Sequence, residues 1–471
     1  MDAPVYDFGM VGLGVMGRNL LLNMADHGFA VTGFDKDPAK AAQLESTANP
    51  GTKVKGATSL SAFVSGLKTP RRIMMLVPAG PIVDAVIADL LPLLEKDDIL
   101  IDGGNSHFTD TERRLTALQD KQVHFIGMGV SGGEKGARTG PSIMPGGDVN
   151  AWKALQPILE AVSAKVNNEP CVSYMGTGAA GHYVKMVHNG IEYATMQLIS
   201  EAYDLLKRGC GYNNDALHAL FTKWNEGESR SYLIEITRDI FLQPDEFSKE
   251  RLLDMIVDRA GSKGTGKWTA QDAMDLGIPV PTIDVAVSMR DLSSYAEERK
   301  QAAILYKHVV RPVTDKQFTK QVHDALYCSI LICYAQGIAQ LQKASVDLKM
   351  EIPVADVIRI WRGGCIIRSS ILDLILPLLK KDKTATHLLL HKKVAQQIRK
   401  RTPALRKVVR QAVASRIPAS ATLSALSYLE SFSSEKLPVN LIQAQRDYFG
   451  AHTYQRTDRE GTFHTNWQSA G

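Results

Sequence analysis

The chain has 471 residues, of which 44% are hydrophobic and 22% are charged, and its formal net charge is +5. A chain of this length and composition is expected to form two or three domains and to bury its own core. Bulk disorder and a small disulfide-stabilised scaffold are therefore excluded.

The cysteines and the chain ends indicate where the protein works. Five widely spaced cysteines, with no CxxC pair among them, favour a reducing compartment and argue against a disulfide framework or a zinc site. No apolar run reaches the roughly 18 residues that a membrane span needs, and neither end shows a secretory, retention or peroxisomal signal. We expect a cytoplasmic protein that does not associate with membranes.

The first part of the chain alternates short apolar runs with amphipathic segments, which is typical of βαβ units around a parallel sheet. The expected strands are residues 7–11, 30–34, 72–77, 99–101 and 123–126, and the expected helices are residues 18–27, 81–94 and 109–120. A stretch rich in Gly and Pro follows (127–147), and then a further strand and a helix over 152–162. We predict an α/β domain over residues 1–179.

A glycine-rich motif follows the first expected strand. Residues 12–17 fit G-x-G-x-x-G and stand between a strand and a helix, as a dinucleotide-binding turn requires. The first Gly allows the tight turn, the second lets a pyrophosphate approach the backbone, and the third lets the helix pack closely with its N-terminus towards the phosphates. This predicts a Rossmann domain with cofactor contacts at Gly12, Leu13, Gly14, Val15, Met16 and Gly17.

The residue that ends the second expected strand bears on the choice of dinucleotide. Asp35 lies 18 residues after Gly17. A carboxylate here accepts hydrogen bonds from the ribose hydroxyls of NAD and repels the 2′-phosphate of NADP. Lys36 follows it and partly offsets that repulsion.

Two further motifs match other catalytic loops but lack their context. Residues 129–133 fit the G-x-S-x-G nucleophile elbow, yet the residues after Ser131 do not open a helix cleanly, so we expect a flexible loop that offers a hydroxyl and backbone N–H groups. Residues 261–267 fit G-x-x-x-x-G-K, but Trp268 replaces the Ser or Thr that binds Mg²⁺, and the preceding residues are expected to be helical rather than a strand. Neither a serine hydrolase nor a P-loop enzyme is indicated.

From residue 180 the pattern changes to helical periodicity, which is clearest over 183–207, 322–343 and 394–414. We predict a large all-helical domain over residues 180–437. The remaining residues, 438–471, contain Pro, Gly and many aromatic residues and are expected to form an extended C-terminal tail.

The segment 181–193 combines several catalytic chemistries on one helical face. Five polar residues fall within an arc of roughly 140°, because successive residues of a helix are about 100° apart. They are Lys185, His188, Asn189, Glu192 and Tyr193. Lys185 and Glu192 lie two turns apart, roughly 10 Å along the axis, so both reach a small substrate. The alternative is a solvated face broken by a turn at Asn189–Gly190.

Positive charge is concentrated near the end of the helical region. Residues 380–410 contain eleven Lys or Arg and one acid, so this stretch has a charge of +10 and the rest of the chain −5. A solvated helical face is the simplest interpretation, and a surface for an acidic partner or a nucleic acid is the alternative. Because the charge is confined to one stretch, we do not expect a general nucleic-acid binder.

Several long segments match one family. They are GLGVMGRNL, IDGGNS, GVSGGEKGAR, GPSIMPGG, GHYVKMVHNGIEY, KGTGKWT, WRGGCIIRS and QAQRDYFGAHTY. On these segments the chain resembles the decarboxylating 6-phosphogluconate dehydrogenases over nearly its whole length. The resemblance implies a homodimer whose tails reach into the partner subunit. It also implies the conversion of 6-phosphogluconate to ribulose 5-phosphate and CO₂ with reduction of NAD or NADP, and no metal.

The resemblance also implies roles for individual residues. Lys185 would take the proton of the C3 hydroxyl as hydride leaves C3, and Glu192 would protonate C1 after CO₂ is lost. The sugar acid would be held by Asn105, Ser131, Gly132, Gly133, His188 and Asn189, and its phosphate end by Tyr193, Lys263, Arg290, Arg446 and His452, the last two from the other subunit. Besides the glycine-rich turn, the cofactor would contact Asp35, Lys36, Asp37, Val77, Pro78, Ala79 and Asn105.

Two positions depart from the family pattern. Where NADP-type members have Asn-Arg-Thr or Asn-Arg-Ser, this chain has Asp35-Lys36-Asp37, and the usual Val-Lys-Ala-Gly loop is Val-Pro-Ala-Gly at residues 77–80. Both changes reduce the positive charge near the cofactor. They predict a preference for NAD, although NADP is the family default.

Two other functions stay open. Dehydrogenases of short β-hydroxyacids such as 3-hydroxyisobutyrate share the glycine-rich turn and a Lys–Asn helix, but they are shorter and lack the phosphate-binding residues and the tail. A non-catalytic, cofactor-sensing interaction protein is the second alternative. Such a protein would have no need of Lys185 and Glu192.

Overall fold

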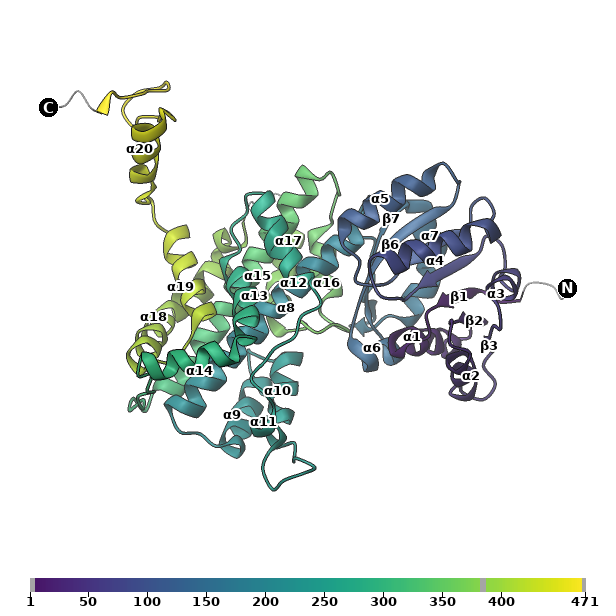
Figure 1. Ribbon diagram of the computed structural model, residues 1–471, viewed down its shortest axis with the longest axis horizontal. Helices are drawn as coiled ribbons and strands as arrows, with labels where there is room; N and C mark the ends of the chain where they lie inside the picture. The colour runs from purple at the N-terminus through teal and green to yellow at the C-terminus, as the bar shows by residue number, and fades with distance from the viewer. Residues whose placement is uncertain (1–4, 382–386, 468–471) are drawn as a thin grey trace. The chain divides into compact units, whose positions relative to one another are not determined.

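A seven-stranded sheet organises the N-terminal part of the chain (Figure 1). The computed structural model describes residues 5–381 and 387–467. In spatial order the strands are β3 (Val54–Gly56), β2 (Val31–Phe34), β1 (Phe8–Val11), β4 (Arg72–Met75), β5 (Ile99–Asp102), β6 (His124–Ser131) and β7 (Ser142–Gly147). All neighbours are parallel except β6 and β7, which are antiparallel. The order reverses between β1 and β4, which is the crevice where Rossmann sheets bind dinucleotides.

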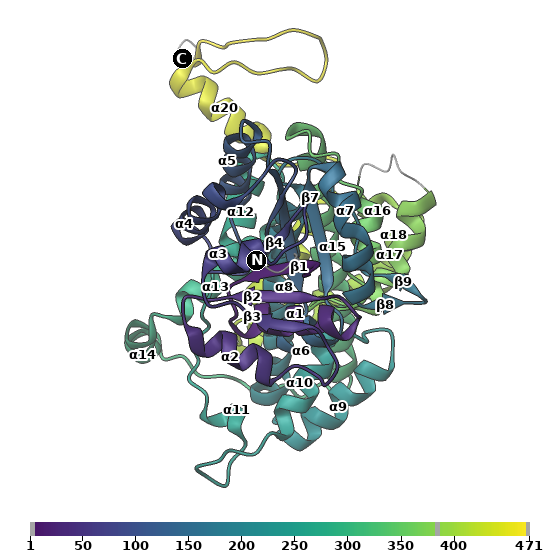
Figure 2. The same cartoon turned by 90° about the vertical axis from the view of Figure 1, so that its right-hand side faces the viewer.

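Helices cover both faces of this sheet, and the central strands β1, β4 and β5 bury side chains on both sides. They are α1 (Val15–Asp26), α2 (Pro38–Ser46), α3 (Leu60–Ser65), α4 (Pro81–Leu90), α5 (Phe108–Gln119), α6 (Gly133–Thr139) and α7 (Val149–Val162). One apolar core joins α1 and α7 to the sheet, and a second core joins α3, α4 and α5 to the opposite face (Figure 2). The Rossmann domain is confirmed, although β3, α2 and α3 are shorter elements that the periodicity did not predict.

The expectation of a flexible loop after Ser131 is wrong. Strand β6 runs to Ser131, and α6 begins at Gly133. Gly132 and Gly133 have φ angles of 130° and 64°, which let the chain turn sharply into the helix. The sequence of α6 is a poor helix former, and contact with α1 stabilises it. Asn23 of α1 donates a hydrogen bond to the carbonyl of Ala137 at 3.1 Å.

A large set of helices follows. They are α8 (Ala180–Asp204, continued by a π-helical turn, Leu205–Gly209), α9 (Asn214–Glu226), α10 (Tyr232–Leu242), α11 (Leu252–Met255), α12 (Thr265–Asp275), α13 (Pro281–Ser293), α14 (Ala296–Leu305), α15 (Phe318–Asp347), α16 (Val354–Ile360), α17 (Ser370–Lys381), α18 (Lys392–Ser415) and α19 (Ser420–Phe432). The all-helical character is confirmed. The helix expected just before the motif at residues 261–267 is largely wrong, because only the short α11 forms in residues 251–260. No strand forms in residues 251–260 either.

Helix α15 is the core of the helical region. It is long and apolar enough to cross a membrane, but 89% of its most apolar window is buried among the other helices. It is therefore a core helix, and α8 and α18 both pack on it.

The last part of the chain forms a compact unit of its own, residues 426–471. It contains a further helix, α20 (Val439–Gly450), which the Pro and Gly content did not predict. Asp447 of α20 is buried and accepts hydrogen bonds from the backbone of Thr453 (2.9 Å) and Thr465 (3.1 Å) and from Nε1 of Trp467 (2.8 Å). The predicted boundaries at residues 179 and 437 stay predictions, since compactness divides the chain after residue 425.

Candidate active site

Helix α8 presents the five polar residues predicted to share a face. The helix is continuous through Asn189 and Gly190, so the alternative of a solvated face broken by a turn is wrong. Lys185 is 7% exposed and His188 is fully buried, while 21% of the Glu192 side chain is exposed. A Cβ at position 190 would lie 2.5 Å from the side chain of Thr269, so glycine lets α12 pack directly against the centre of this helix.

Glycines bring α8 against the edge of the sheet. A Cβ on Gly181 would lie 2.1 Å from the carbonyl oxygen of Gly127 in β6. A Cβ on Gly129 would lie 2.3 Å from Cβ of Lys185. The side chain of Lys185 therefore crosses β6 at a point where only glycine leaves room for it.

Burial shifts the pKa values of Lys185 and Glu192 in opposite directions. Desolvation lowers the pKa of the Lys185 ammonium, and the charge of Glu192 opposes this shift. Desolvation raises the pKa of the Glu192 carboxyl, against the charges of Lys185 and Arg290. The shifts favour the neutral form of both groups, so Lys185 is suited to accept a proton and Glu192 to donate one, as acid–base catalysis needs.

Ser131, His188 and Asn189 form a connected polar group beside Lys185. Nε2 of His188 is 3.2 Å from the hydroxyl of Ser131, and Nδ1 is 3.0 Å from Oδ1 of Asn189. Burial, followed by the charge of Lys185, lowers the pKa of His188 well below its usual range. A neutral imidazole with its proton on Nδ1 satisfies both contacts, because it donates to Asn189 and accepts from Ser131.

Three residues predicted to bind the phosphate end also lie together. The guanidinium of Arg290 stacks 3.5 Å from the ring centre of Tyr193, and the backbone N–H of Lys263 donates to the Tyr193 hydroxyl at 3.4 Å. Gly266 lets α12 approach the same ring, since a Cβ there would lie 2.4 Å from it. The Tyr193 ring therefore joins α8, α13 and the loop before α12.

Arg446 and His452, the other two residues predicted to bind the phosphate, lie in a different unit of the chain from Tyr193. Both are exposed and belong to the separate unit of residues 426–471. Arg446 lies on α20, where it donates to Gln443 at 3.2 Å, and the His452 ring lies 5.9 Å from that of Phe449. Their assignment to the phosphate stays a prediction.

The glycine-rich turn fits a dinucleotide. Gly12 has a φ of 95°, and a Cβ on it would lie 2.5 Å from the carbonyl oxygen of Leu76. A Cβ on Gly17 would lie 2.0 Å from the carbonyl oxygen of Gly12, so both residues must be glycine for this turn to form. Gly14 caps α1 without a side chain and borders open space, which leaves the helix N-terminus accessible to a pyrophosphate.

Asp35 is held beside this turn at the end of β2. Its carboxylate accepts hydrogen bonds from the backbone N–H of Leu13 at 2.8 Å and of Asp37 at 3.0 Å, and Nζ of Lys40 lies 3.3 Å away. Burial opposes ionisation, but these hydrogen bonds and Lys40 lower the pKa of Asp35 below its usual range. A charged carboxylate therefore borders the turn. Lys36 is exposed, and Asp37 caps α2.

The remaining predicted contacts lie in loops at the same end of the sheet. Val77, Pro78 and Ala79 lie between β4 and α4, and Asn105 is exposed between β5 and α5. Gly132 and Gly133 lie between β6 and α6, and a Cβ on Gly132 would lie 2.7 Å from the carbonyl oxygen of Gly364. These positions follow the carboxyl ends of β4, β5 and β6, where open α/β sheets bind ligands.

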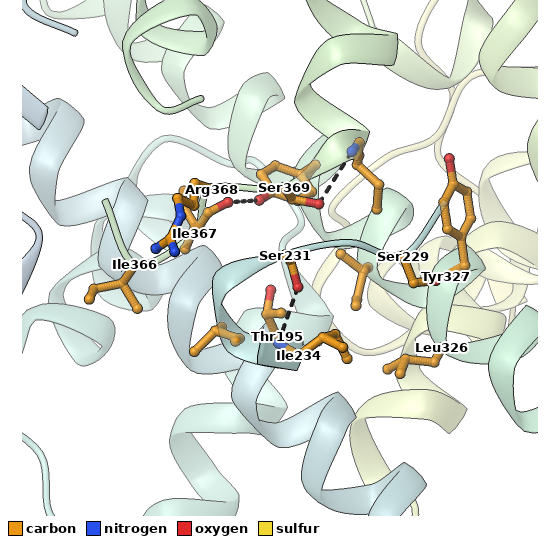
Figure 3. Close-up of a pocket in the computed structure, with 14 residues that line it drawn as sticks. Thr195, Ser229, Ser231, Ile234, Leu326, Tyr327, Ile366, Ile367, Arg368 and Ser369 are labelled. Carbon is orange, nitrogen blue, oxygen red and sulfur yellow. Dashed lines mark hydrogen bonds between the residues drawn. The ribbon is translucent and has the colours of Figure 1, made fainter. Parts of the chain in front are cut away.

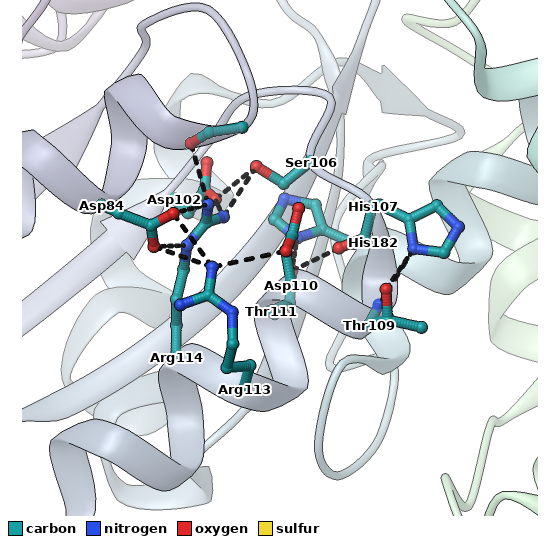
Figure 4. Close-up of polar contacts among 11 residues, drawn as sticks. Asp84, Asp102, Ser106, His107, Thr109, Asp110, Thr111, Arg113, Arg114 and His182 are labelled. Atoms are coloured by element: carbon teal, nitrogen blue, oxygen red, sulfur yellow. Dashed lines mark hydrogen bonds and ion pairs between the residues drawn. The ribbon is translucent and has the colours of Figure 1, made fainter.

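Arg114 joins two of these loops, and the sequence motifs did not reveal it (Figure 4). It is 2% exposed and donates to Asp84 at the start of α4 (2.8 Å), to Asp102 at the end of β5 (3.2 Å) and to the carbonyl of Gly80 (3.0 Å). Asp102 in turn accepts from the Ser106 hydroxyl at 2.6 Å. The guanidinium groups of Arg114 and Arg113 hold the pKa of Asp84 at about 2.

A sequence signal for this network existed. Thr111, Arg114 and Leu118 form the buried stripe of α5, so a cation stands among the inward-facing positions of an amphipathic helix. The hydroxyl of Thr111 also lies 2.6 Å from Nδ1 of His182, one turn before Lys185 on α8. The network therefore reaches the helix that presents Lys185.

A separate cavity lies among α8, α10, α15 and residues 366–369 (Figure 3). Thr195, Ser231 and Arg368 provide polar groups in its wall, and Ile234 and Leu326 provide apolar ones. None of the predicted site residues lines it. The cavity is therefore distinct from the candidate active site.

Family models match two adjoining parts of the chain. The NAD binding domain of 6-phosphogluconate dehydrogenase matches residues 7–176, and the C-terminal domain of 6-phosphogluconate dehydrogenase matches residues 181–467. The second match alone covers more than half of the chain.

The chain belongs to the 6-phosphogluconate dehydrogenase family.

Individual relatives match over nearly the whole length of this family member. It is 49% identical over 462 residues to the NADP(+)-dependent decarboxylating 6-phosphogluconate dehydrogenase of Bacillus subtilis, covering 98% of each chain. It is 46% identical over 477 residues to decarboxylating 6-phosphogluconate dehydrogenase 1 of Saccharomyces cerevisiae, covering 99% of this chain and 97% of the yeast protein. The solved 6-phosphogluconate dehydrogenase of Plasmodium falciparum superposes with a TM-score of 0.95 at 43% identity, covering 98% of this chain and 100% of that one.

Proposed function

We propose that this chain catalyses the oxidative decarboxylation of 6-phosphogluconate to ribulose 5-phosphate and CO₂, with reduction of a nicotinamide dinucleotide. The observation that supports this most directly is the pair Lys185 and Glu192. Both lie on one face of α8, at the edge of a dinucleotide-binding sheet, with pKa values shifted towards each other. The Plasmodium falciparum relative was solved with NADP⁺ and with 6-phosphogluconate.

The two residues divide the proton transfers between them. When bound, the dinucleotide supplies an acceptor for the hydride of C3. Neutral Lys185 takes the proton of the C3 hydroxyl as the C3 carbonyl forms. The bond to the carboxylate then breaks, CO₂ leaves, and its bonding electrons pass to the carbonyl oxygen, which regains the proton from Lys185.

The resulting enediol is converted to the product ketone at the same site. Glu192, whose pKa is raised by burial, protonates the carbon that was C2 of 6-phosphogluconate and becomes C1 of the product. The proton of the enediol hydroxyl returns to Lys185 as the carbonyl of ribulose 5-phosphate forms. A proton must then pass from Lys185 to Glu192 before the next turnover, and the two groups are close enough to influence each other's pKa.

The other polar residues hold the substrate. Ser131, His188 and Asn189 offer hydrogen bonds to the sugar acid, with Asn105, Gly132 and Gly133 beside them. Arg290, Lys263 and Tyr193 offer two cations and a hydroxyl to the phosphate, a donor set that suits a phosphate dianion. The neutral His188 imidazole leaves Lys185 free of a neighbouring cation, which keeps its pKa from being lowered further.

NAD is the preferred dinucleotide in this proposal. Asp35, Lys36 and Asp37 stand where NADP-type members have Asn-Arg-Thr or Asn-Arg-Ser, and the Asp35 carboxylate is fixed by two backbone N–H groups. A bound 2′-phosphate would meet this charge at the end of β2. The Bacillus subtilis relative is named NADP(+)-dependent, so the proposed preference for NAD separates this chain from it.

We further propose a cytoplasmic homodimer in which each tail completes the site of the other subunit. The unit of residues 426–471 is held together by its own contacts around Asp447, and it presents Arg446 and His452 on its exposed side. A unit with its own internal contacts and with Arg446 and His452 exposed is suited to bind in the active site of another chain.

Co-expression of two defective chains tests the exchange. A Lys185→Met chain has an intact tail, and an Arg446→Ala chain has an intact base. In a random mixture of dimers, tail exchange gives each mixed dimer one intact site, so about a quarter of the wild-type activity returns. If tails act on their own chain, no mixed dimer has an intact site and no activity returns.

The reaction itself is tested with 6-phosphogluconate deuterated at C3. Transfer of the label to the reduced nicotinamide, with ribulose 5-phosphate as product, supports the proposal. Reduction without transfer of that label contradicts it.

A further inference from the structure

Helix α18 has a composition that neither the fold nor the proposed reaction explains. Over Lys392–Ser415 it contains eight Lys or Arg and no acidic residue. It runs along the outer side of the helical region (Figures 1 and 2) and holds none of the predicted site residues. The charge of this helix is therefore free of any role in the candidate active site.

Most of the basic residues of α18 gather on one face of the helix. Seven of the basic side chains are exposed, and all of them except Arg406 fall within an arc of about 120°, at 100° per residue. The six on this arc are Lys392, Lys393, Arg399, Lys400, Lys407 and Arg410. The opposite side of the helix is the apolar stripe that packs on α15, with Val394, Leu405 and Val408 at most 1% exposed. We call these six exposed basic residues the basic face.

Arg401 shows what a structural cation on this helix looks like. It points to the buried side, pairs with Glu228, and its guanidinium lies 4.1 Å from the ring centre of Tyr327. No residue of the basic face has such a partner. Within residues 5–381 and 387–425, no carboxylate lies within ion-pair distance of any of the six.

The arrangement opposes the stability of the helix itself. Lys392 and Lys393 lie in the first turn, where the helix dipole disfavours positive charge. Lys407 and Arg410 are like charges three residues apart, and such pairs repel. Since α18 itself contains no acidic residue to offset these costs, the basic face is suited to an anion supplied from outside the chain.

We propose that the basic face is a docking surface for the phosphate backbone of a double-stranded nucleic acid. From Lys392 to Arg410 the face is about 27 Å long, at 1.5 Å per residue, which is most of one duplex turn of about 34 Å. Lys393, Lys400 and Lys407 form a ridge with a regular seven-residue spacing. A row of separate cations matches a row of phosphates, which carry one charge per 1.7 Å of duplex.

The residues between the cations argue against other occupants. Gln396, Pro403 and Ala414 lie on the same arc, so the face has no aromatic ring on which an unpaired base would stack. It has no large apolar residue to insert into a lipid layer, because the apolar stripe of α18 is buried on α15. A second copy cannot dock face to face, since like charges would meet.

The test measures binding of the full-length protein to a fluorescent 24-base-pair DNA duplex over a range of salt concentrations. If the six cations each contact one phosphate, the slope of log K against log[salt] is about −5, at 0.9 per contact. The variant Lys393→Gln/Lys400→Gln/Lys407→Gln removes the ridge and should make the slope shallower by about 3. Its activity with 6-phosphogluconate and its unfolding temperature should match the wild type or exceed it.

A matched control separates the face from bulk charge. Lys53→Gln/Lys96→Gln/Lys121→Gln removes three exposed lysines of the Rossmann domain, and with them the same net charge. This variant should keep the wild-type slope. Equal weakening in both triple variants, or no binding of the wild type at 50 mM salt, would overturn the proposal. Tighter binding to vesicles of phosphatidylglycerol and phosphatidylcholine than to the duplex would also overturn it and assign the face to lipid.

Discussion

The contact between Gly129 and Lys185 makes a single added methyl group a sharp probe of the site. In Gly129→Ala the new Cβ would lie 2.3 Å from Cβ and 2.9 Å from Cγ of Lys185. Ordinary contact begins at 3.4 Å, so the lysine or its helix must move by about 1 Å.

The expected cost follows from that displacement. A base misplaced by about 1 Å lowers kcat by about 100-fold, and overpacking a core of this kind costs about 1–3 kcal/mol of stability. The assay compares kcat with 6-phosphogluconate and the urea midpoint for wild type, Gly129→Ala and Gly227→Ala. At position 227 the nearest atom to an added Cβ is 3.6 Å away, so this control should lose neither. If Gly129→Ala keeps kcat within twofold of the wild type while folded, the placement of Lys185 against β6 is wrong.

Three further predictions concern the charges of the site. Lys185→Met should lower kcat by about 10²–10⁴-fold. It should also raise the stability at pH 7, because burial lowers the pKa of Lys185 in the folded state. Denaturant midpoints should show this gain vanishing as the pH approaches 10.5, where the lysine of the unfolded chain is neutral too. Arg114→Met leaves Asp102 buried without its cation, so it should lower the free energy of unfolding in urea by about 3–5 kcal/mol and raise KM for the dinucleotide. The control Arg113→Met removes an exposed cation and should cost less than about 1 kcal/mol. Equal effects of the two substitutions would refute the role of Arg114. Asp35→Asn should raise the ratio of kcat/KM for NADP to that for NAD at least about tenfold, and an unchanged ratio would show that Asp35 does not set the choice.

The Rossmann domain and the polar face of α8 could be predicted because local patterns encode them. The strands are continuous apolar runs buried on both faces, and the glycine-rich turn has a fixed spacing. The residues of α8 share a face through helical geometry alone, so the spacing of Lys185 and Glu192 predicts their common face without knowledge of their surroundings. Their opposed pKa shifts, by contrast, come from burial, which the helical pattern does not give.

The features that escaped prediction depend on contacts between distant segments. Helix α6 forms after Ser131 although its sequence, GEKGART, is a poor helix former, because α1 packs against it. The role of Arg114 depends on α4, β5 and α5 meeting at one point. Helix α20 is organised by Asp447, whose partners follow it by 6 to 20 residues. No periodicity or motif records such contacts.

The most direct test of the central claim is the initial rate of nicotinamide reduction by the wild-type protein with 6-phosphogluconate, followed together with CO₂ release and run in parallel with NAD and NADP. We expect one CO₂ for each dinucleotide reduced and a higher kcat/KM with NAD. Reduction without CO₂, or no reduction with either dinucleotide, would contradict the roles of Lys185 and Glu192. A higher kcat/KM with NADP would leave those roles intact and contradict the assignment of cofactor choice to Asp35.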